Sequence, residues 1–345
     1  ENMLSRPIHE YEGDENDRRN FALFHSLSCS RNRIFPVDHV DAHAASTYFL
    51  SPYDEATILV VDGGLGIYRA EGLELTCIDR MGYLDGILDG QNLGVKFVPG
   101  VGRFFDFVTE MLGYERNSFA AGKTMGLAAY GHTVPRQDYI PVDPDRHTST
   151  VFDYSKTMEW VSKHGPVFDP NREPGGYESL LSPKWVNVAR QGQETLNDDM
   201  RFLAREALRK AGSKNLCLAG GVALSCVANR AIRDSGLFDD VFIQPAASDE
   251  GIPLGVALAT YYRSGGRQRM KLEHSYLGKP NNSIELPETL ANSGLDYCKV
   301  EDKQVAELLA AGKIVARCQG ASEYGPRALG NRSILADPRR ADMRH

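Results

Sequence analysis

Two histidines four residues apart are the first feature of this sequence that can do chemistry. His39 and His43 lie in DHVDAHAAS (residues 38–46), a stretch with helical character. Four residues are slightly more than one helical turn, so both imidazoles point off the same face. Two neutral nitrogen ligands fixed on one turn form half of a metal site. The pair by itself is weak support for a metal, because histidines on a helix are more often satisfied by ordinary hydrogen bonds.

Two aspartates stand where they can complete such a site. Asp62 follows a strongly apolar predicted strand, so its carboxylate should emerge at the edge of a sheet, where ligands bind. Asp249 follows a second predicted strand and precedes a helix, and helix capping is its competing role. Two imidazoles and two carboxylates suit Fe(II), Mn(II) or Zn(II), with positions left open for substrate oxygens. We therefore predict a metal site at His39, His43, Asp62 and Asp249.

A glycine pair between a predicted strand and a predicted helix is suited to hold a phosphate. Gly220 and Gly221 let the backbone approach closely, and the following helix offers unpaired N–H groups. Tight packing is the competing explanation for this pair. Asn229, two turns into that helix, faces either the sugar of a nucleotide or solvent. Lys123, in the small-residue segment 121–131, either neutralises a phosphate or is an exposed lysine.

The C-terminal motif EYGPRALGNRSIL (residues 323–335) combines charge with a rigid frame. Arginine forks bind phosphate or carboxylate through two hydrogen bonds. Glu323, Arg327 and Arg332 sit among Gly, Pro and Ser residues, which place them too rigidly for a solvated face. We predict a ligand-binding role for these three residues.

An α/β fold must position these residues. The sequence predicts an antiparallel meander of three strands, followed after residue 195 by alternating helices and strands, which indicate a parallel sheet. This is the layout of one lobe of the actin, sugar-kinase and Hsp70 group of nucleotide-binding folds, by analogy of architecture. The predicted strands are 57–61, 67–70, 73–78, 216–219 and 241–243, and the predicted helices are 38–46, 104–112, 196–211, 222–234 and 252–262.

The remaining segments are less regular. Residues 132–190 are either an insertion near a substrate or a surface excursion, and residues 265–287 are a predicted linker rich in Gly, Pro and Asn. Residues 1 to about 30 are irregular or helical. Because Glu1 is not a natural start and the chain stops soon after the C-terminal motif, we expect segments to be missing at both ends. A helix is predicted at 304–311 and a strand at 314–318.

Composition limits the classes of function. The chain has 345 residues, 42% of them hydrophobic and 25% charged, with a net charge of −7. We expect no nucleic-acid partner, because a grip on the phosphate backbone needs a basic surface. No apolar run reaches membrane-spanning length, so we expect no membrane contact. Six cysteines without a Cys-x-x-Cys pair favour a reducing cytoplasm, with Cys77, Cys217 and Cys318 as small buried side chains.

Together these motifs strongly resemble the ATP-dependent carbamoyltransferases of natural-product biosynthesis, the group that includes the tobramycin and nodulation-factor enzymes. The last motif is long and highly specific. The matching stretches occur in family order across residues 35–338: HxxxHAAS (39–46), VVDG (60–63), GKxMGLA (122–128), GGVAL (220–224), PAASDxG (245–251) and EYGPRALGNRSIL (323–335).

The resemblance implies two domains. Residues 1–270 would be a metal- and nucleotide-binding domain like the universal tRNA threonylcarbamoyl transferase, and residues 271–345 the linker and the beginning of a smaller α+β domain. In such enzymes the second domain makes carbamoyl-adenylate from carbamoyl phosphate and ATP, and the first passes the carbamoyl group to a hydroxyl of a small molecule. By position, the two histidines and two aspartates match the metal ligands, with Fe(II) expected. The Gly220–Gly221 turn and Asn229 match the nucleotide-binding region.

Departures from the family pattern leave two other interpretations open. The Gly-rich strand and His-Asp-x-x-Ala stretch that normally open the family are missing, and Ser225 replaces the Asn that usually follows Gly-Gly-Val-Ala-Leu. One alternative is an enzyme like tRNA threonylcarbamoyl transferase, which would lack the motif at 323–335. The other is a truncated, non-catalytic nucleotide-binding module. The general base is not evident, and Asp41 is a candidate only by proximity. The acceptor and homodimer formation also stay open.

Overall fold

The computed structural model describes most of the chain beyond residue 36. The described residues are 37–81, 100–114, 120–133, 139–148, 151–164, 167–279, 286–294, 296, 298, 300–340 and 343. The predictions for residues 1 to about 30 therefore lie outside the described residues.

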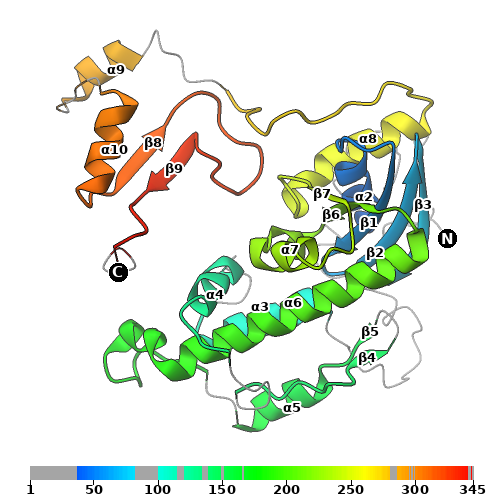
Figure 1. Ribbon diagram of the computed structural model, residues 1–345, viewed down its shortest axis with the longest axis horizontal. Coiled ribbons are helices and arrows are strands. Elements are labelled where there is room, and N and C mark those ends of the chain that lie inside the picture. Colours follow the sequence, from blue (N-terminus) through cyan, green and yellow to red (C-terminus); the bar gives the residue numbers. More distant parts are fainter. Residues whose placement is uncertain are drawn as a thin grey trace, which may run out of the picture.

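A five-stranded mixed sheet forms the centre of the molecule (Figure 1). Its strands are β1 (Glu55–Val61), β2 (Leu65–Glu71), β3 (Glu74–Met81), β6 (Asn215–Ala219) and β7 (Asp240–Ile243), in the spatial order β3-β2-β1-β6-β7. Antiparallel pairing joins β1 to β2 and β2 to β3, whereas β6 is parallel to both β1 and β7. The predicted meander and parallel unit are both confirmed. The chain is thus an α/β protein with the sheet expected for one lobe of an actin-like nucleotide-binding domain.

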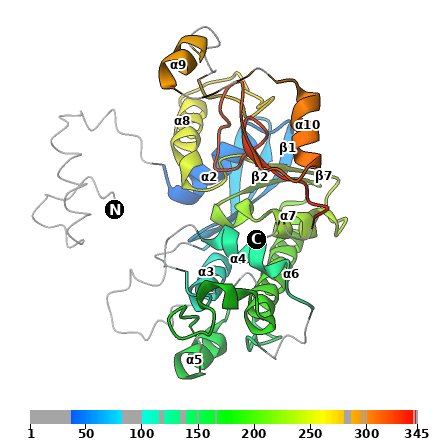
Figure 2. The same ribbon diagram turned by 90° about the vertical axis from the view of Figure 1, so that its left-hand side faces the viewer.

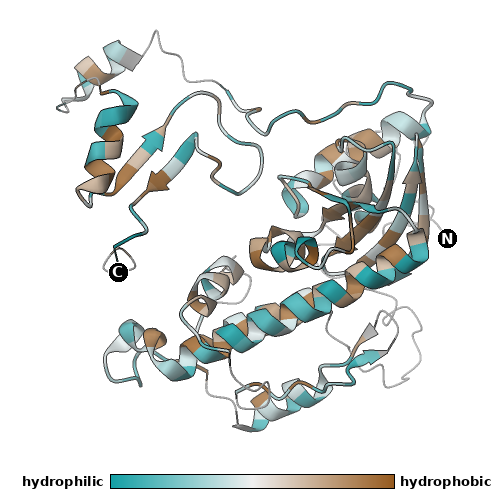
Figure 3. Ribbon diagram, in the orientation of Figure 1, coloured by the Kyte–Doolittle hydropathy of each residue, from teal (hydrophilic) through white to brown (hydrophobic). Residues whose placement is uncertain are grey.

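Helices cover both faces of this sheet (Figures 1 and 2). The helices α2 (His39–Tyr48) and α8 (Ile252–Arg263) pack on one face, and α3 (Val101–Met111) and α6 (Pro183–Ala211) on the other. In Figure 3 the central strands are largely brown, whereas α6 alternates between brown and teal along its length. The central strands β1 and β6 are thus buried on both sides, and α6 is amphipathic.

The strand β1 supplies apolar side chains to both cores. Ile58 and Val60 belong to the core under α2 and α8, and Leu59 and Val61 to the core under α3 and α6. Because successive side chains of a strand point to opposite faces, four consecutive apolar residues can fill two cores. The two covering helices on the first face approach closely at Gly255, where a Cβ atom would lie 2.0 Å from a backbone oxygen of α2.

A helical layer lies below the sheet in Figure 1, where α4 (Ala121–Ala128) and α3 pack on α6. The segment 132–190 contains more regular structure than its composition suggests. It includes the hairpin of β4 (His147–Thr148) and β5 (Val151–Phe152), the helix α5 (Ser155–His164) and the 3₁₀ turn η4 (Gly176–Leu181).

The long helix α6 begins well before residue 196, where the sequence pattern places its start. Pro183 occupies the first turn, a position that tolerates the missing N–H. Asn187 and Gln191 interrupt the apolar pattern, yet both are buried and accept hydrogen bonds from the backbone N–H groups of His132 and Ile140, each at 2.9 Å. These buried amides hold the preceding segment against the helix. Because they are polar residues at buried positions, the apolar periodicity of this part of α6 cannot be recognised in the sequence.

A buried ionic cluster ties the same segment to α6 further along the helix. The fully buried Asp199 accepts hydrogen bonds from Arg146 Nε at 3.0 Å and from the hydroxyl of Tyr154. The ring of His147 lies 3.0 Å from the same carboxylate and stacks on Phe202. Because these hydrogen bonds satisfy the buried carboxylate of Asp199, it holds β4 and the chain that follows it at a defined place on α6.

The C-terminal part of the chain builds a separate two-stranded sheet. An extended segment after α8 leads to α9 (Leu286–Ser293), and then α10 (Asp302–Ala310) precedes the antiparallel strands β8 (Val315–Cys318) and β9 (Arg332–Leu335). The strand β9 lies inside the C-terminal motif. It was not predicted, because glycine and arginine residues surround its short apolar run.

The expectation that Cys77 and Cys318 are buried is wrong, whereas Cys217 is buried as predicted. Cys77 lies on the edge strand β3, and Cys318 on the small C-terminal hairpin, where one face of each strand meets solvent. All five cysteines among the described residues are free thiols. Within the described ranges, no helix combines the length and apolar character needed to cross a membrane.

Removing the carboxylate of the buried ionic cluster should destabilise the protein strongly. Asp199→Ala leaves the buried guanidinium of Arg146 without its partner, which should lower the free energy of unfolding by about 3–5 kcal/mol. Denaturant unfolding measures this change. Glu159→Ala, which breaks the exposed ion pair with Lys163, is the matched control and should change little. Equal effects of the two substitutions would contradict a structural role for the cluster.

Candidate functional site

The first two turns of α2 present the two histidines to the carboxyl edge of the sheet. Asp38 caps the helix by accepting hydrogen bonds from Val40 N at 2.8 Å and Asp41 N at 3.4 Å. The cap fixes the start of the helix and therefore the direction of the side chains one turn apart. His43 is fully buried, whereas the side chain of His39 is about half exposed (48%).

The two aspartates come from the ends of β1 and β7. Asp62 follows β1, and Asp249 opens the short 3₁₀ turn η6 (Asp249–Gly251). Nε2 of His39 lies 2.9 Å from Asp62 Oδ2 and 3.4 Å from Asp249 Oδ1, and Nε2 of His43 lies 3.6 and 3.5 Å from the same two oxygens. One ligand atom from each residue lies within 4.8 Å of the others. The structure thus brings together the four residues predicted to bind a metal.

The donor set fits a divalent cation. Among the described residues, neither ring nitrogen of the buried His43 has a hydrogen-bond partner. A buried polar atom without a partner is costly, and a cation held by this nitrogen would remove that cost. Two imidazoles and two carboxylates suit first-row metals such as Fe(II), Mn(II) or Zn(II), and the open side of the exposed residues leaves room for another ligand.

The protonation of the cluster follows from the same contacts. Burial raises the pKa of Asp62, but the imidazoles of His39 and His43 and the Gly221 N–H outweigh it, so the pKa of this carboxyl lies well below its usual range. The hydrogen bond to Asp62 raises the pKa of His39 despite partial burial. The carboxylate is therefore charged at neutral pH, the form in which it binds cations.

A glycine turn lies against the same aspartate. Gly220 has a positive φ of 92° and packs so closely on β1 that a Cβ atom would lie 2.3 Å from Val61 O. The N–H of Gly221 then donates to Asp62 Oδ1 at 2.7 Å. Because only glycine fits both the backbone conformation and the close approach, the pair joins the end of β6 directly to the candidate metal cluster.

The segment predicted as one helix at 222–234 is divided in two at Ser225. The 3₁₀ turn η5 (Gly221–Leu224) comes first, and α7 (Cys226–Arg233) follows, with the Ser225 hydroxyl as its cap accepting from Ala228 N. Ser225 thus does the structural work that starts α7. Asn229 is buried and faces inward: its Nδ2 donates to Ala223 O at 2.6 Å, and its Oδ1 has no partner among the described residues.

The C-terminal motif reaches this turn through one arginine. Arg327 Nη2 donates to Leu224 O at 2.7 Å, and a Cβ atom on Gly122 would lie 3.7 Å from Arg327 Nη1. Lys123 follows in α4, with its ammonium 5.6 Å from the centre of the Tyr114 ring. Arg327, predicted to bind a ligand, thus contacts the end of η5 directly, whereas Lys123 is exposed on α4.

The other two charged residues of the motif bind their own loop. Glu323 accepts hydrogen bonds from the backbone N–H groups of Leu329, Asn331 and Arg332 at 2.9, 2.8 and 3.1 Å, and these bonds, that from Leu329 first, lower the pKa of Glu323 to about 2. The guanidinium of Arg332 donates to Gln319 O at 2.7 Å. Such contacts shape the loop that carries Arg327.

The carboxylate suggested as a general base lies elsewhere. Asp41 accepts hydrogen bonds from the Tyr68 hydroxyl at 2.9 Å and from Arg263 at 3.2 Å, and the structure does not bring it into the metal cluster. Positions i and i+2 of a helix point to different sides, so the residue between two clustered histidines must face away from them.

A carboxylate that the sequence did not single out lies on a helix that packs beside Asp62. On α3, a Cβ atom at Gly102 would lie 3.7 Å from Asp62 O, and Asp106 is one turn further along the same helix face. The side chain of Asp106 is 54% exposed; partial desolvation raises its pKa, Arg103 lowers it, and the charges of Glu110 and Asp62 raise it further. In the sequence Asp106 is a lone polar residue in FFDFV (residues 104–108), and this pattern does not indicate which part of the fold its side chain lies near.

Comparisons with known proteins agree with these motifs. Residues 20–144 and 193–258 match the family described as carbamoyltransferase N-terminus, and residues 306–345 match the carbamoyltransferase C-terminus. An uncharacterized protein of Synechocystis is 32% identical over 89% of this chain and 51% of its own length. The nodulation protein NolNO of Sinorhizobium fredii is 31% identical over 90% of this chain and 44% of its own length.

Among solved structures, HypF of T. kodakarensis is 15% identical, with a TM-score of 0.44 over 74% of this chain and 40% of its own. The chain spans about half the length of the curated relatives it matches. The N-terminal family model alone covers more than half of the chain, and its two matched segments contain all four clustered ligands and the glycine turn. The chain belongs to the carbamoyltransferase family.

Proposed function

We propose that this protein transfers a carbamoyl group from carbamoyl phosphate, by way of carbamoyl-adenylate made with ATP, to a hydroxyl of a small-molecule natural product. The observation that carries the proposal is the buried imidazole of His43, which makes no hydrogen bond within the described residues, in a cluster of two histidines and two aspartates beside a glycine turn. Membership of the carbamoyltransferase family supports the class of reaction.

The four clustered side chains would hold a divalent metal, for which we propose Fe(II), with Mn(II) or Zn(II) as alternatives. Such a cation supplies Lewis-acid polarisation of a carbamoyl or phosphate oxygen. Because Gly221 N–H is bound to Asp62, this donor orients the carboxylate and is not free for phosphate. The charge of the nucleotide phosphate would fall to Lys123 and Arg327, and a sugar hydroxyl to Asn229 Oδ1, which has no hydrogen-bond partner in the part of the chain that the structure describes.

In the transfer step the acceptor oxygen attacks the carbamoyl carbon. The bond between that carbon and the AMP oxygen breaks, and AMP leaves with the electron pair. We assign the hydroxyl proton to Asp106, because it lies on the face of α3 directed at Asp62 and its raised pKa makes it a stronger base than an ordinary carboxylate. Residues 132–190 would shape the acceptor pocket.

Transfer of a threonylcarbamoyl group to tRNA is the rival enzymatic function. The match of residues 306–345 to the C-terminal carbamoyltransferase family favours the first proposal. A non-catalytic nucleotide-binding module is the third alternative, and it requires neither metal nor transfer.

Removal of the buried imidazole should abolish metal binding. His43→Ala deletes a ligand that other side chains cannot replace, so metal content measured by elemental analysis should fall to background after dialysis against a weak chelator. His274→Ala, at an exposed position, is the control and should retain full metal. Full metal content in both His43→Ala and Asp249→Ala would show that the metal site is wrongly placed.

Carbamoyl transfer should be visible by mass spectrometry. Incubation with carbamoyl phosphate, ATP and a panel of hydroxylated natural products should give one product heavier by a carbamoyl group in place of a hydrogen. The full-length protein is the appropriate sample, since this chain spans about half of its relatives. A metal-loaded protein that consumes ATP yet modifies tRNA alone would favour the rival function.

The proposed base should set the acidic limb of the pH profile. Asp106 accepts a proton only when ionised, so the rate should be full above its pKa and fall as pH drops through it, at a higher pH than for an ordinary carboxyl. With the acceptor identified by mass spectrometry, Asp106→Asn should lower the rate of carbamoyl transfer by about 10²-fold or more and remove the acidic limb of the pH–rate profile. Its metal content should be unchanged. Asp41→Asn is the control, and equal losses in both would refute the assignment.

A further inference from the structure

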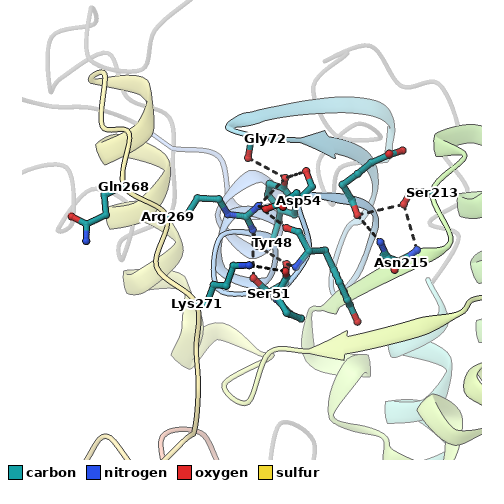
Figure 4. Close-up of polar contacts among 12 residues, drawn as sticks. Tyr48, Ser51, Asp54, Gly72, Ser213, Asn215, Gln268, Arg269 and Lys271 are labelled. Atoms are coloured by element: carbon teal, nitrogen blue, oxygen red, sulfur yellow. Dashed lines mark hydrogen bonds and ion pairs between the residues drawn. The ribbon is translucent and has the colours of Figure 1, made fainter.

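The segment that leaves the metal-bearing domain is bound tightly to the far end of α2. We call residues 268–278 the strap. Its Arg269 donates to Tyr53 O at 2.5 Å and to Tyr48 O at 2.9 Å, and the guanidinium carbon lies 4.4 Å from the centre of the Tyr48 ring. Figure 4 shows Arg269 crossing from the extended chain to Tyr48, Ser51 and Asp54, with Lys271 beside it. The side chain of Arg269 is only 12% exposed.

Arg269 supplies the positive charge that the last turn of α2 lacks. The last turn of α2 contains no basic residue, and its last carbonyl, Tyr48 O, accepts hydrogen bonds from Ser51 N at 3.0 Å and from the Ser51 hydroxyl at 2.8 Å besides the one from Arg269. A cation at a helix C-terminus compensates the partial negative charge there, and a planar guanidinium can reach several oxygens at once. Arg269 comes from a distant part of the chain and caps the C-terminal end of α2. The N-terminal half of the same helix carries His39 and His43.

The strap continues from α2 to the C-terminal motif by backbone hydrogen bonds. Leu272 N donates to Leu50 O at 2.9 Å, Tyr324 N donates to Ser275 O at 2.6 Å, and Gly278 N donates to Ser322 O at 2.9 Å. One end of the strap is thus fixed on the metal helix, and the other end is paired with the loop at 322–324.

That loop is the one that reaches the glycine turn. At Gly325 a Cβ atom would lie 2.3 Å from Pro245 O, in the loop that leads to Asp249, and Arg327 donates to Leu224 O at 2.7 Å. A continuous series of short contacts therefore runs from α2 through the strap to the arginine beside the turn.

We propose that Arg269 is a positioning residue: by anchoring the strap to the C-terminal end of α2, it holds the loop 322–332 against the metal-bearing domain with Arg327 at the glycine turn. The segment predicted as a plain linker is in this respect a structural connection between the metal helix and the C-terminal motif. The consequence is that the order of the loop depends on a side chain more than fifty residues earlier.

Hydrogen exchange of the ligand-free protein tests the proposal without reference to catalysis. Arg269→Ala removes several charge-assisted hydrogen bonds, so amides at 322–327, including Tyr324, should exchange about tenfold faster or more. Arg267→Ala removes the same charge at an exposed position two residues earlier and should leave these amides unchanged. Arg269→Lys keeps the charge but loses the fork, and intermediate protection is expected.

A second readout separates positioning from general stability. Affinity for the non-hydrolysable ATP analogue AMP-PNP should fall in Arg269→Ala while metal content stays complete. If Arg269→Ala does not fold, Arg269→Lys carries the same two measurements. Faster exchange confined to residues 47–53 and 268–272, with unchanged protection at 322–327, would overturn the proposal. If the unsubstituted protein does not bind AMP-PNP, the proposed nucleotide site is wrong. The hydrogen-exchange test of Arg269 remains valid in that case.

Discussion

The carboxylate of Asp62 is the interaction on which the rest of the site depends. One of its oxygens lies 2.9 Å from His39 Nε2, and the other accepts the Gly221 N–H at 2.7 Å. A single side chain thereby joins the end of β1, the first turn of α2 and the glycine turn after β6. Since the carboxyl ends of parallel strands meet at one edge of a sheet, the topology that buries β1 also delivers this carboxylate to its partners.

Much of this arrangement could be predicted from the sequence, because it depends on local signals. The apolar run of β1 ends abruptly at Asp62, and a four-residue spacing defines one face of a helix. Strands separated by helices of ordinary length must form a parallel sheet, which fixes the side of the sheet at which the ligands gather. These signals gave the α/β class, the meander and the convergence of His39, His43, Asp62 and Asp249.

The rest depended on contacts between distant residues, which no local pattern contains. The early start of α6 was hidden because its polar residues Asn187 and Gln191 are buried against backbone N–H groups. Nothing in the helical pattern around Asp106 indicates a functional role. It becomes a candidate only because Gly102, one turn earlier on the same helix, packs beside Asp62. Glu323 illustrates the same limit, since its charge suggested a ligand, whereas its carboxylate holds three N–H groups of its own loop.

X-ray absorption spectroscopy of the purified full-length protein loaded with Fe(II) tests the central claim most directly, since it reads the atoms around the metal. The cluster predicts a first shell of nitrogen and oxygen only, with the outer-shell scattering of two imidazoles. A shell containing sulfur, or a spectrum without imidazole scattering, would contradict the account.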